Sequence, residues 1–243
     1  MNLVRLNLAA IALAGSTLFA GVLEPGSQVC VDITATEQDV QNEGPLTSTQ
    51  QFCTDVLEDG SFEFSQSEFS LGSDFINQLF FGGQADPFLS YGIAVADFGA
   101  PTTFGFSFSI PIAGGPYNTA THTMSASLTA GPDGSVSIGP AGGASDIAFA
   151  SVDATNLGID LGGAGCTGGP GSSVCGPFTE SIMFGPSSPA TATVEVNFLG
   201  SGGGDTYGIT GSLLIDSTAV PEPASTALVG LGLAAIAFVR RRR

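Results

Sequence analysis

The single histidine of this chain limits the chemistry that its side chains could perform. Every Ser-His-Asp or Cys-His scheme would have to use His122 as its base. His122 shares one side of a predicted strand with Met124, Ala126 and Leu128, which indicates a partly buried structural side chain. A zinc centre built on histidine normally uses two or three histidines, so this kind of site is also disfavoured.

Carboxylates are the other groups that could catalyse a reaction. Two of them suffice to hydrolyse a glycosidic bond, and the chain has twenty-two Asp and Glu residues. Grooves that cleave or bind glycans usually hold sugars on aromatic faces, yet Trp is absent and Tyr occurs only at positions 91, 117 and 207. The eighteen Phe residues fall mostly at inward strand positions. We therefore expect no enzymatic activity, and a carboxylate-based glycoside hydrolase is only the third hypothesis.

Calcium is the one cofactor that the composition suggests. Hard cations prefer oxygen ligands, which Asp153, Asn156 and Asp160 could supply around Gly158, as could Asp205 after three glycines. None of these residues shows the Asp-x-Asp-x-Asp-Gly spacing of a helix-loop-helix calcium site. Carboxylates that stabilise turns by bonding to their own backbone give the same pattern, so both interpretations stay open.

The segments that position these residues are predicted to be β-strands. From Thr102 to Ile112 apolar and polar side chains alternate strictly, which is typical of a half-buried strand. Clusters of Gly, Pro, Asp and Asn separate the strands. The same period of two recurs in residues 61–71 (with a phase shift near Gln66), 89–97, 121–130, 147–152, 178–184, 190–198 and 207–215.

One segment looks helical instead. Ser73 could cap a short helix that Gly82 ends, with an apolar face formed by Phe75, Ile76, Leu79 and Phe80. About nine or ten strands with almost no helix predict a single all-β domain over residues 21–218. We expect an antiparallel β-sandwich or jelly roll, and a closed barrel is the less favoured form.

The domain has no basic side chain except His122. The five Lys and Arg residues of the chain are Arg5 and Arg240 to Arg243, and only one of the twenty-two carboxylates, Glu222, lies in the tail. The domain therefore carries about twenty-one negative charges that no cation can pair. Such a surface repels DNA, RNA and anionic headgroups, so nucleic-acid binding is excluded. Its self-repulsion predicts a fold that gains stability as ionic strength rises.

Residues 1–20 have the features of a secretory signal peptide. A positive charge at Arg5 precedes an apolar stretch from Leu6 to Leu18, and small residues surround a plausible cleavage point after Ala20. The export machinery reads this combination of a charged start and a short apolar run. We therefore expect the chain to be exported.

The other end combines three features in order. Val220-Pro221-Glu222-Pro223 is followed by an apolar run over residues 224–239 and then by Arg240, Arg241, Arg242 and Arg243. A helix over this run would be roughly 24 Å long, and long Arg side chains can make up the small shortfall against the hydrocarbon core. Basic flanks stay on the cytoplasmic side. We therefore expect a transmembrane helix in the inner membrane with the domain outside the cytoplasm.

This tail resembles the PEP-CTERM sorting signal over about residues 219–243. The resemblance implies recognition by an exosortase, a membrane-embedded protease that works near Pro221, Glu222 and Pro223. It also implies release or re-anchoring at the cell surface or in an extracellular matrix, often in bacteria that make exopolysaccharide. An ordinary anchor that is never processed is the alternative. Neither interpretation bears on the chemistry of the domain.

Four cysteines, Cys30, Cys53, Cys166 and Cys175, lie in the exported domain. An even number in an oxidising compartment predicts two disulfides. Three connectivities are possible, and Cys30 with Cys53 and Cys166 with Cys175 is the simplest. A four-cysteine zinc site would normally show tight Cys-x-x-Cys pairs, and none occurs. The second disulfide would staple residues 162–176, which we expect to form a surface loop.

These features predict a non-enzymatic β-sandwich protein that is secreted or held at the cell surface. A structural or adhesive role in an exopolysaccharide matrix follows from the resemblance of the tail. The alternative is a glycan-binding or peptide-binding module, including a calcium-dependent version. The expected partners are the secretion machinery, an exosortase, the inner membrane and exopolysaccharide.

Overall fold

The computed structural model describes residues 26–38, 44–85 and 87–217. The predicted signal peptide and the whole C-terminal tail, including the predicted transmembrane helix at 224–239, lie outside these residues. Within the described ranges, no helix has the length and apolar character needed to cross a membrane.

Fourteen β-strands make up the regular structure of the described residues. They are β1 (Gln28–Glu37), β2 (Leu46–Asp55), β3 (Ser61–Leu71), β4 (Asp74–Gln84), β5 (Phe88–Asp97), β6 (Thr102–Pro111), β7 (Tyr117–Thr129), β8 (Val136–Pro140), β9 (Ala148–Val152), β10 (Thr155–Leu161), β11 (Cys166–Gly168), β12 (Ser172–Ser187), β13 (Thr191–Gly200) and β14 (Asp205–Asp216).

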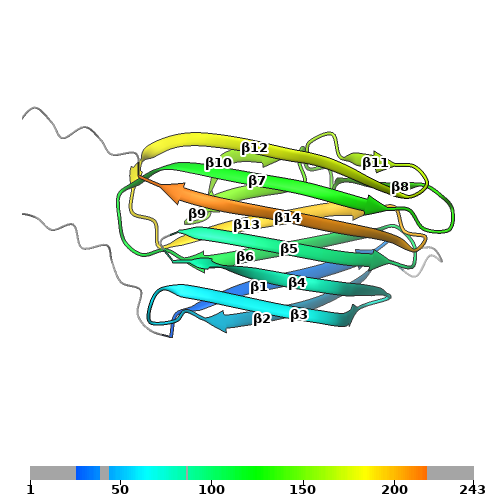
Figure 1. The fold of residues 1–243 in the computed structure, drawn as a ribbon, viewed down its shortest axis with the longest axis horizontal. Helices are drawn as coiled ribbons and strands as arrows, with labels where there is room; N and C mark the ends of the chain where they lie inside the picture. The colour runs from blue at the N-terminus through cyan, green and yellow to red at the C-terminus, as the bar shows by residue number, and fades with distance from the viewer. Residues whose placement is uncertain (1–25, 39–43, 86, 218–243) are drawn as a thin grey trace, which may run out of the picture.

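The strands form two sheets that stack face to face (Figure 1). Sheet A has the order β10-β9-β13-β6-β1-β2, with β8 beside β13 and β11 beside β8. Sheet B has the order β12-β7-β14-β5-β4-β3. The pairings are antiparallel throughout, as in β1 with β6 and β14 with β7. The predicted antiparallel β-sandwich is confirmed, with more strands than the nine or ten expected.

Phenylalanines from both sheets fill the space between the layers. The alternation predicted for residues 102–112 is confirmed in β6, where Phe104, Phe106 and Phe108 are buried. In β3 the predicted phase shift is also confirmed. Phe64 and Phe69 both pack against the core although they are five residues apart, because Glu68 between them has a positive φ of 54° and resets the alternation.

The helix predicted for residues 73–81 is wrong, because this segment belongs to strand β4. A bulge between Ile76 and Gln78 in the pairing with β5 inserts one extra residue. Ile76 and Leu79 are therefore both buried although they are three residues apart, a spacing that imitates helical periodicity. Phe80, predicted on the same helical face, alternates with the buried Leu79 and Phe81 and points outward.

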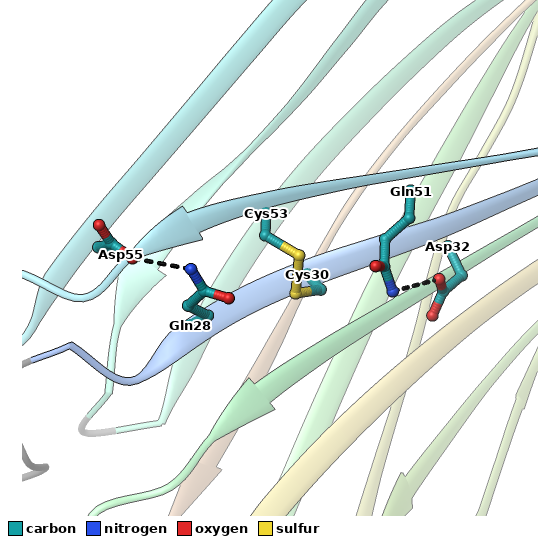
Figure 2. Close-up of a disulfide and its surroundings, with 6 residues drawn as sticks. All are labelled: Gln28, Cys30, Asp32, Gln51, Cys53 and Asp55. Carbon is teal, nitrogen blue, oxygen red and sulfur yellow. Dashed lines mark hydrogen bonds between the residues drawn. A yellow bond between two sulfur atoms is a disulfide. The ribbon is translucent and has the colours of Figure 1, made fainter.

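Both predicted disulfides are present. Cys30 and Cys53 lie directly opposite each other on β1 and β2 (Figure 2). Cys166 and Cys175 join β11 to β12, and so connect the two sheets. The prediction of a surface loop for residues 162–176 is wrong in part, because β11 and the first residues of β12 lie within it.

Candidate functional site

The middle of the outer face of sheet B carries no charge across five adjacent strands, and the outward carboxylate on these strands, Asp216, is the last residue of β14. We call this middle part the neutral face and define it by the following outward side chains of β4, β5, β14, β7 and β12. They are Gln78, Phe80, Gly82, Gln84, Phe88, Ser90, Gly92, Ala94, Gly208, Thr210, Ser212, Leu214, Thr121, Thr123, Ser125, Ser127, Val174, Thr179 and Ser181. In a chain with a formal net charge of −17, a surface of this extent without Asp or Glu is unusual.

Hydroxyl groups pair across the strands of the neutral face. The side chains of Thr123 and Ser212 lie 2.9 Å apart, and those of Ser125 and Thr210 lie 3.1 Å apart. Each pair stands directly opposite in the β7–β14 register. A hydroxyl has one donor and two acceptor positions, so these groups stay able to bond to a polar ligand after they have bonded to each other.

Phe80 lies across the neighbouring strand instead of projecting into solvent. It stands opposite Gly92 of β5, and a β-carbon at position 92 would come within 1.9 Å of its Cε1 atom. Only a glycine opposite it allows the ring to occupy this position. The helix predicted for residues 73–81 places Phe80 on the buried face and therefore misses its outward position. The one indication of this position in the sequence is Gly92, the residue opposite Phe80.

Two adjoining hollows lie on either side of Phe80. One, of about 190 Å³, extends from Phe80 over small residues of β5, β14 and β7 to Val174 of β12. The other, of about 470 Å³, lies between Phe80 and Phe88 and reaches Glu63 of β3. Gln78 lines both hollows. This arrangement can hold an extended, uncharged ligand by ring stacking and hydrogen bonds.

The outer face of sheet A differs in charge. Asp32, Glu195 and Asp160 point outward from β1, β13 and β10, and they lie on one line across the sheet in the strand register. Partial burial, together with the nearby charges of Asp146 and Glu180, raises the pKa of Asp160. An anionic ligand would therefore be repelled from sheet A.

The four calcium candidates do not converge. Asp153, Asn156 and Asp160 belong to the β9–β10 hairpin of sheet A, whereas Asp205 begins β14 of sheet B. Oδ1 of Asp153 accepts bonds from the backbone N–H groups of Ala190 and Thr191 at 2.9 and 3.0 Å.

Side-chain oxygens of two other candidates also accept hydrogen bonds from backbone N–H groups. Oδ1 of Asn156 accepts a bond from the N–H of Gly158, and Oδ1 of Asp205 accepts one from the N–H of Gly131 at 2.7 Å. Within the described residues, no group of three or more His, Cys, Asp or Glu side chains is placed to hold a metal ion. The contacts of these residues are those of side chains that stabilise turns.

Asp74 and Asp97 are fully enclosed near one end of the sandwich. The carboxylate of Asp97 accepts a bond from the N–H of Gly202 at 3.0 Å, and Asp74 accepts one from the N–H of Phe98 at 3.2 Å. Burial, followed by the charge of Asp74, raises the pKa of Asp97 to about 7. Both carboxylates therefore hold neighbouring loops in place through backbone N–H groups.

His122 is fully buried, more deeply than the partly buried position predicted for it. Its Nε2 atom lies 2.9 Å from the hydroxyl of Tyr91. Burial lowers the pKa of the imidazole to about 4. The side chain is therefore neutral at pH 7 and out of reach of a substrate.

Comparison with protein families identifies the tail. Residues 219–243 match the family model of the PEP-CTERM protein-sorting motif. The match confirms the resemblance drawn from Pro221, Glu222, Pro223 and the terminal arginines. It marks the chain as an exported, exosortase-sorted protein that passes through a membrane-anchored stage. No curated protein matches the sequence.

Three solved structures show weak similarity to the chain. An isomalto-dextranase of Arthrobacter globiformis complexed with panose is 10% identical with a TM-score of 0.28; the match covers 80% of this chain but only 33% of that one. A C-terminal CBM6 of a laminarinase from Zobellia galactanivorans is 10% identical with a TM-score of 0.21, over 63% of this chain and 98% of that one. The carbohydrate binding module CBM6cm-2 of Cellvibrio mixtus lichenase 5A, in complex with cellotriose, is 14% identical with a TM-score of 0.18, over 65% and 88%. At these TM-scores we infer neither the fold nor the function of this chain from the three structures.

Proposed function

We propose that this exported protein has a structural or adhesive role in an exopolysaccharide matrix, and that its β-sandwich contacts polysaccharide through the neutral face. The observation that carries the proposal is the ring of Phe80 lying across Gly92 of β5, beside the paired hydroxyl groups of β14 and β7. An aromatic face packs against the apolar side of a sugar ring, and neighbouring hydroxyls can bond to the hydroxyls of the sugar.

The arrangement of carboxylates supports binding without catalysis. Hydrolysis of a glycosidic bond needs two carboxyl groups roughly 5 to 10 Å apart on either side of that bond. Of the residues that line the two hollows beside Phe80, only Glu63 carries a carboxylate. The enclosed Asp74 and Asp97 instead bond to backbone N–H groups. We therefore expect the protein to bind polysaccharide and leave it intact.

The binding role can be tested with the secreted protein purified from its host. The protein would be sedimented with purified matrix polysaccharide, and both the bound fraction and the release of reducing ends would be measured. We expect binding with no new reducing ends. Release of reducing ends would instead support the hydrolase, and failure to bind any matrix polysaccharide would overturn the adhesive role.

The sorting step has a separate test. Replacing Pro221, Glu222 and Pro223 with alanine should leave the protein unprocessed in the membrane fraction of the host. A matched triple alanine variant of Ser187, Ser188 and Pro189, which lie outside the motif, should be processed normally. If the motif variant keeps its mature mass and location, the tail acts as a plain anchor.

A further inference from the structure

The two hollows beside Phe80 together form one groove that crosses the strands of sheet B. The hollow that ends at Glu63 spans β3, β4 and β5, and the hollow that ends at Val174 spans β4, β5, β14, β7 and β12. Adjacent strands lie about 4.8 Å apart, so six strands correspond to roughly 24 Å. Along the strands the lining is longest in β5, where it extends from Phe88 to Ala94, or roughly 20 Å at about 3.3 Å per residue. The groove is therefore longer across the strands than along them.

The floor of this groove is flat because its residues are small. Gly92, Thr210 and Ser125 follow Phe80 from strand to strand in register. In the next row Ala94, Gly208 and Ser127 lie between Gln78 and Val174. Phe80 is the one ring in these two rows, and Phe88 lines the part of the groove nearer β3. Val174, with 75% of its surface exposed, forms the wall at the β12 end.

We infer that the ligand is a neutral, unbranched, β-1,4-linked polysaccharide whose chain lies across the strands, with one sugar ring stacked on Phe80. This inference rests on the proposed function and names the ligand class of the same site. A chain of β-1,4-linked pyranoses with equatorial substituents forms an extended flat ribbon, and axial hydrogens give its rings an apolar face. A flat ribbon fits a flat floor, whereas branches or a coiled α-linked chain would clash with it.

The charge of the domain selects a neutral ligand. About twenty-one carboxylates and no Lys or Arg produce a negative potential around the whole domain. An anionic polysaccharide would approach against this potential and would find no cation to pair with its acidic groups. Glu63, at one end of the groove, adds a further negative charge. A neutral polysaccharide is not repelled by this potential and has no acidic groups that need a cation.

The test uses affinity electrophoresis of the secreted protein in gels that contain one polysaccharide each. The probes are barley β-glucan, in which most links are β-1,4, as the neutral β-linked chain, dextran as the neutral α-linked chain, and alginate as the anionic chain. We expect retardation by β-glucan alone. Phe80→Ala should weaken binding by about tenfold or more, which corresponds to the loss of about 1.4 kcal/mol.

Two further variants separate the role of Phe80 from general effects on folding. Phe149→Ala removes an outward ring from sheet A and should leave binding unchanged. Gly92→Ala keeps Phe80 but displaces its ring, because the added β-carbon would overlap with ring atoms, and it should weaken binding. Melting curves of all three variants would show that each is folded.

The outcomes distinguish the inference from the proposed function. If dextran or alginate binds instead of β-glucan, or if Phe80→Ala binds β-glucan as the wild type does, the inference is overturned and the adhesive role stands. If none of the three probes and no matrix polysaccharide binds, the proposed function fails as well.

Discussion

The hydroxyl of Tyr91 lies 2.9 Å from Nε2 of His122, and both side chains are buried between the two sheets. Gly211 makes room for this pair, because a β-carbon there would come within 2.3 Å of the Tyr91 hydroxyl oxygen. Among the described residues, Nδ1 of His122 has no hydrogen-bond partner. A protonated imidazole would therefore place an uncompensated charge in the core, which is why burial lowers its pKa to about 4.

This pair predicts a loss of stability on acidification. The folded-state pKa of His122, about 4, lies below the ordinary value of 6.5, so the unfolded chain binds more protons between these values. The contribution of neutral His122 to the free energy of unfolding is complete above pH 6.5 and is lost as the pH falls towards 4. We expect the wild type to lose about 2 kcal/mol more than His122→Gln between pH 7 and pH 5. Urea unfolding at both pH values measures this difference; equal losses would contradict it.

Asp97 predicts a pH dependence of the opposite sign. Its folded-state pKa of about 7 lies above the ordinary value of 3.8, so the folded state binds more protons between these values and stability falls as the pH rises. No donor among the described residues reaches its Oδ1 atom, so a proton shared with the neighbouring Asp74 is the natural way to hold the two carboxyl groups together.

Asp97→Asn should imitate the protonated state of this pair. We expect the advantage of the variant over the wild type to grow by about 2 to 3 kcal/mol between pH 5 and pH 8, because the wild type loses stability over this range and the variant does not. Glu195→Gln, on the exposed face of sheet A, removes one charge without touching the pair and serves as the control. A variant less stable than the wild type at pH 8 would show that the carboxylate of Asp97 is needed in its charged form.

Reduction of the two disulfides is expected to lower the stability of the domain. Cys166 and Cys175 are nine residues apart and join strands of different sheets, whereas Cys30 and Cys53 are 23 residues apart on neighbouring strands. In the chain-entropy model, closure contributes about 2.5 kcal/mol for the shorter loop and about 3.5 kcal/mol for the longer one. We expect each double serine variant to lower the melting temperature, and reductant to have no further effect once both pairs are replaced.

The unpaired carboxylates predict stabilisation by salt. Raising the sodium chloride concentration from about 0.01 M to 1 M shortens the screening length from about 30 Å to about 3 Å, so self-repulsion falls and the melting temperature should rise. Millimolar calcium at matched ionic strength separates screening from specific binding. An additional shift with calcium would support the calcium-dependent version of the binding module, and its absence would count against it.

Strands with regular alternation could be predicted from the sequence, whereas interrupted strands could not. The strict alternation of residues 102–112 corresponds to β6, which lies between β1 and β13 in sheet A. In β4 the bulge at Asn77 breaks the period of two and makes Ile76 and Leu79 look like one helical face. A bulge depends on the partner strand, and the partner of β4 is not visible in its own residues.

The candidate site on sheet B could not be predicted from the sequence for a similar reason. The disulfide pairs followed from the number and spacing of the cysteines, and both are present. The outward position of Phe80 depends on the bulge that precedes it, and the flat position of its ring depends on register with Gly92. Neither relation can be deduced from composition or periodicity. The absence of charge on one face likewise appears only when the strands are placed in order.

The lack of cationic side chains also has a consequence for degradation. Trypsin-like proteases cut after Lys or Arg, and the chain has neither between Arg5 and Arg240. Unfolding would therefore expose no cleavage site for this class of enzyme anywhere in the domain. The domain would resist the whole class even after denaturation, and tryptic peptide mapping would recover it as one large fragment.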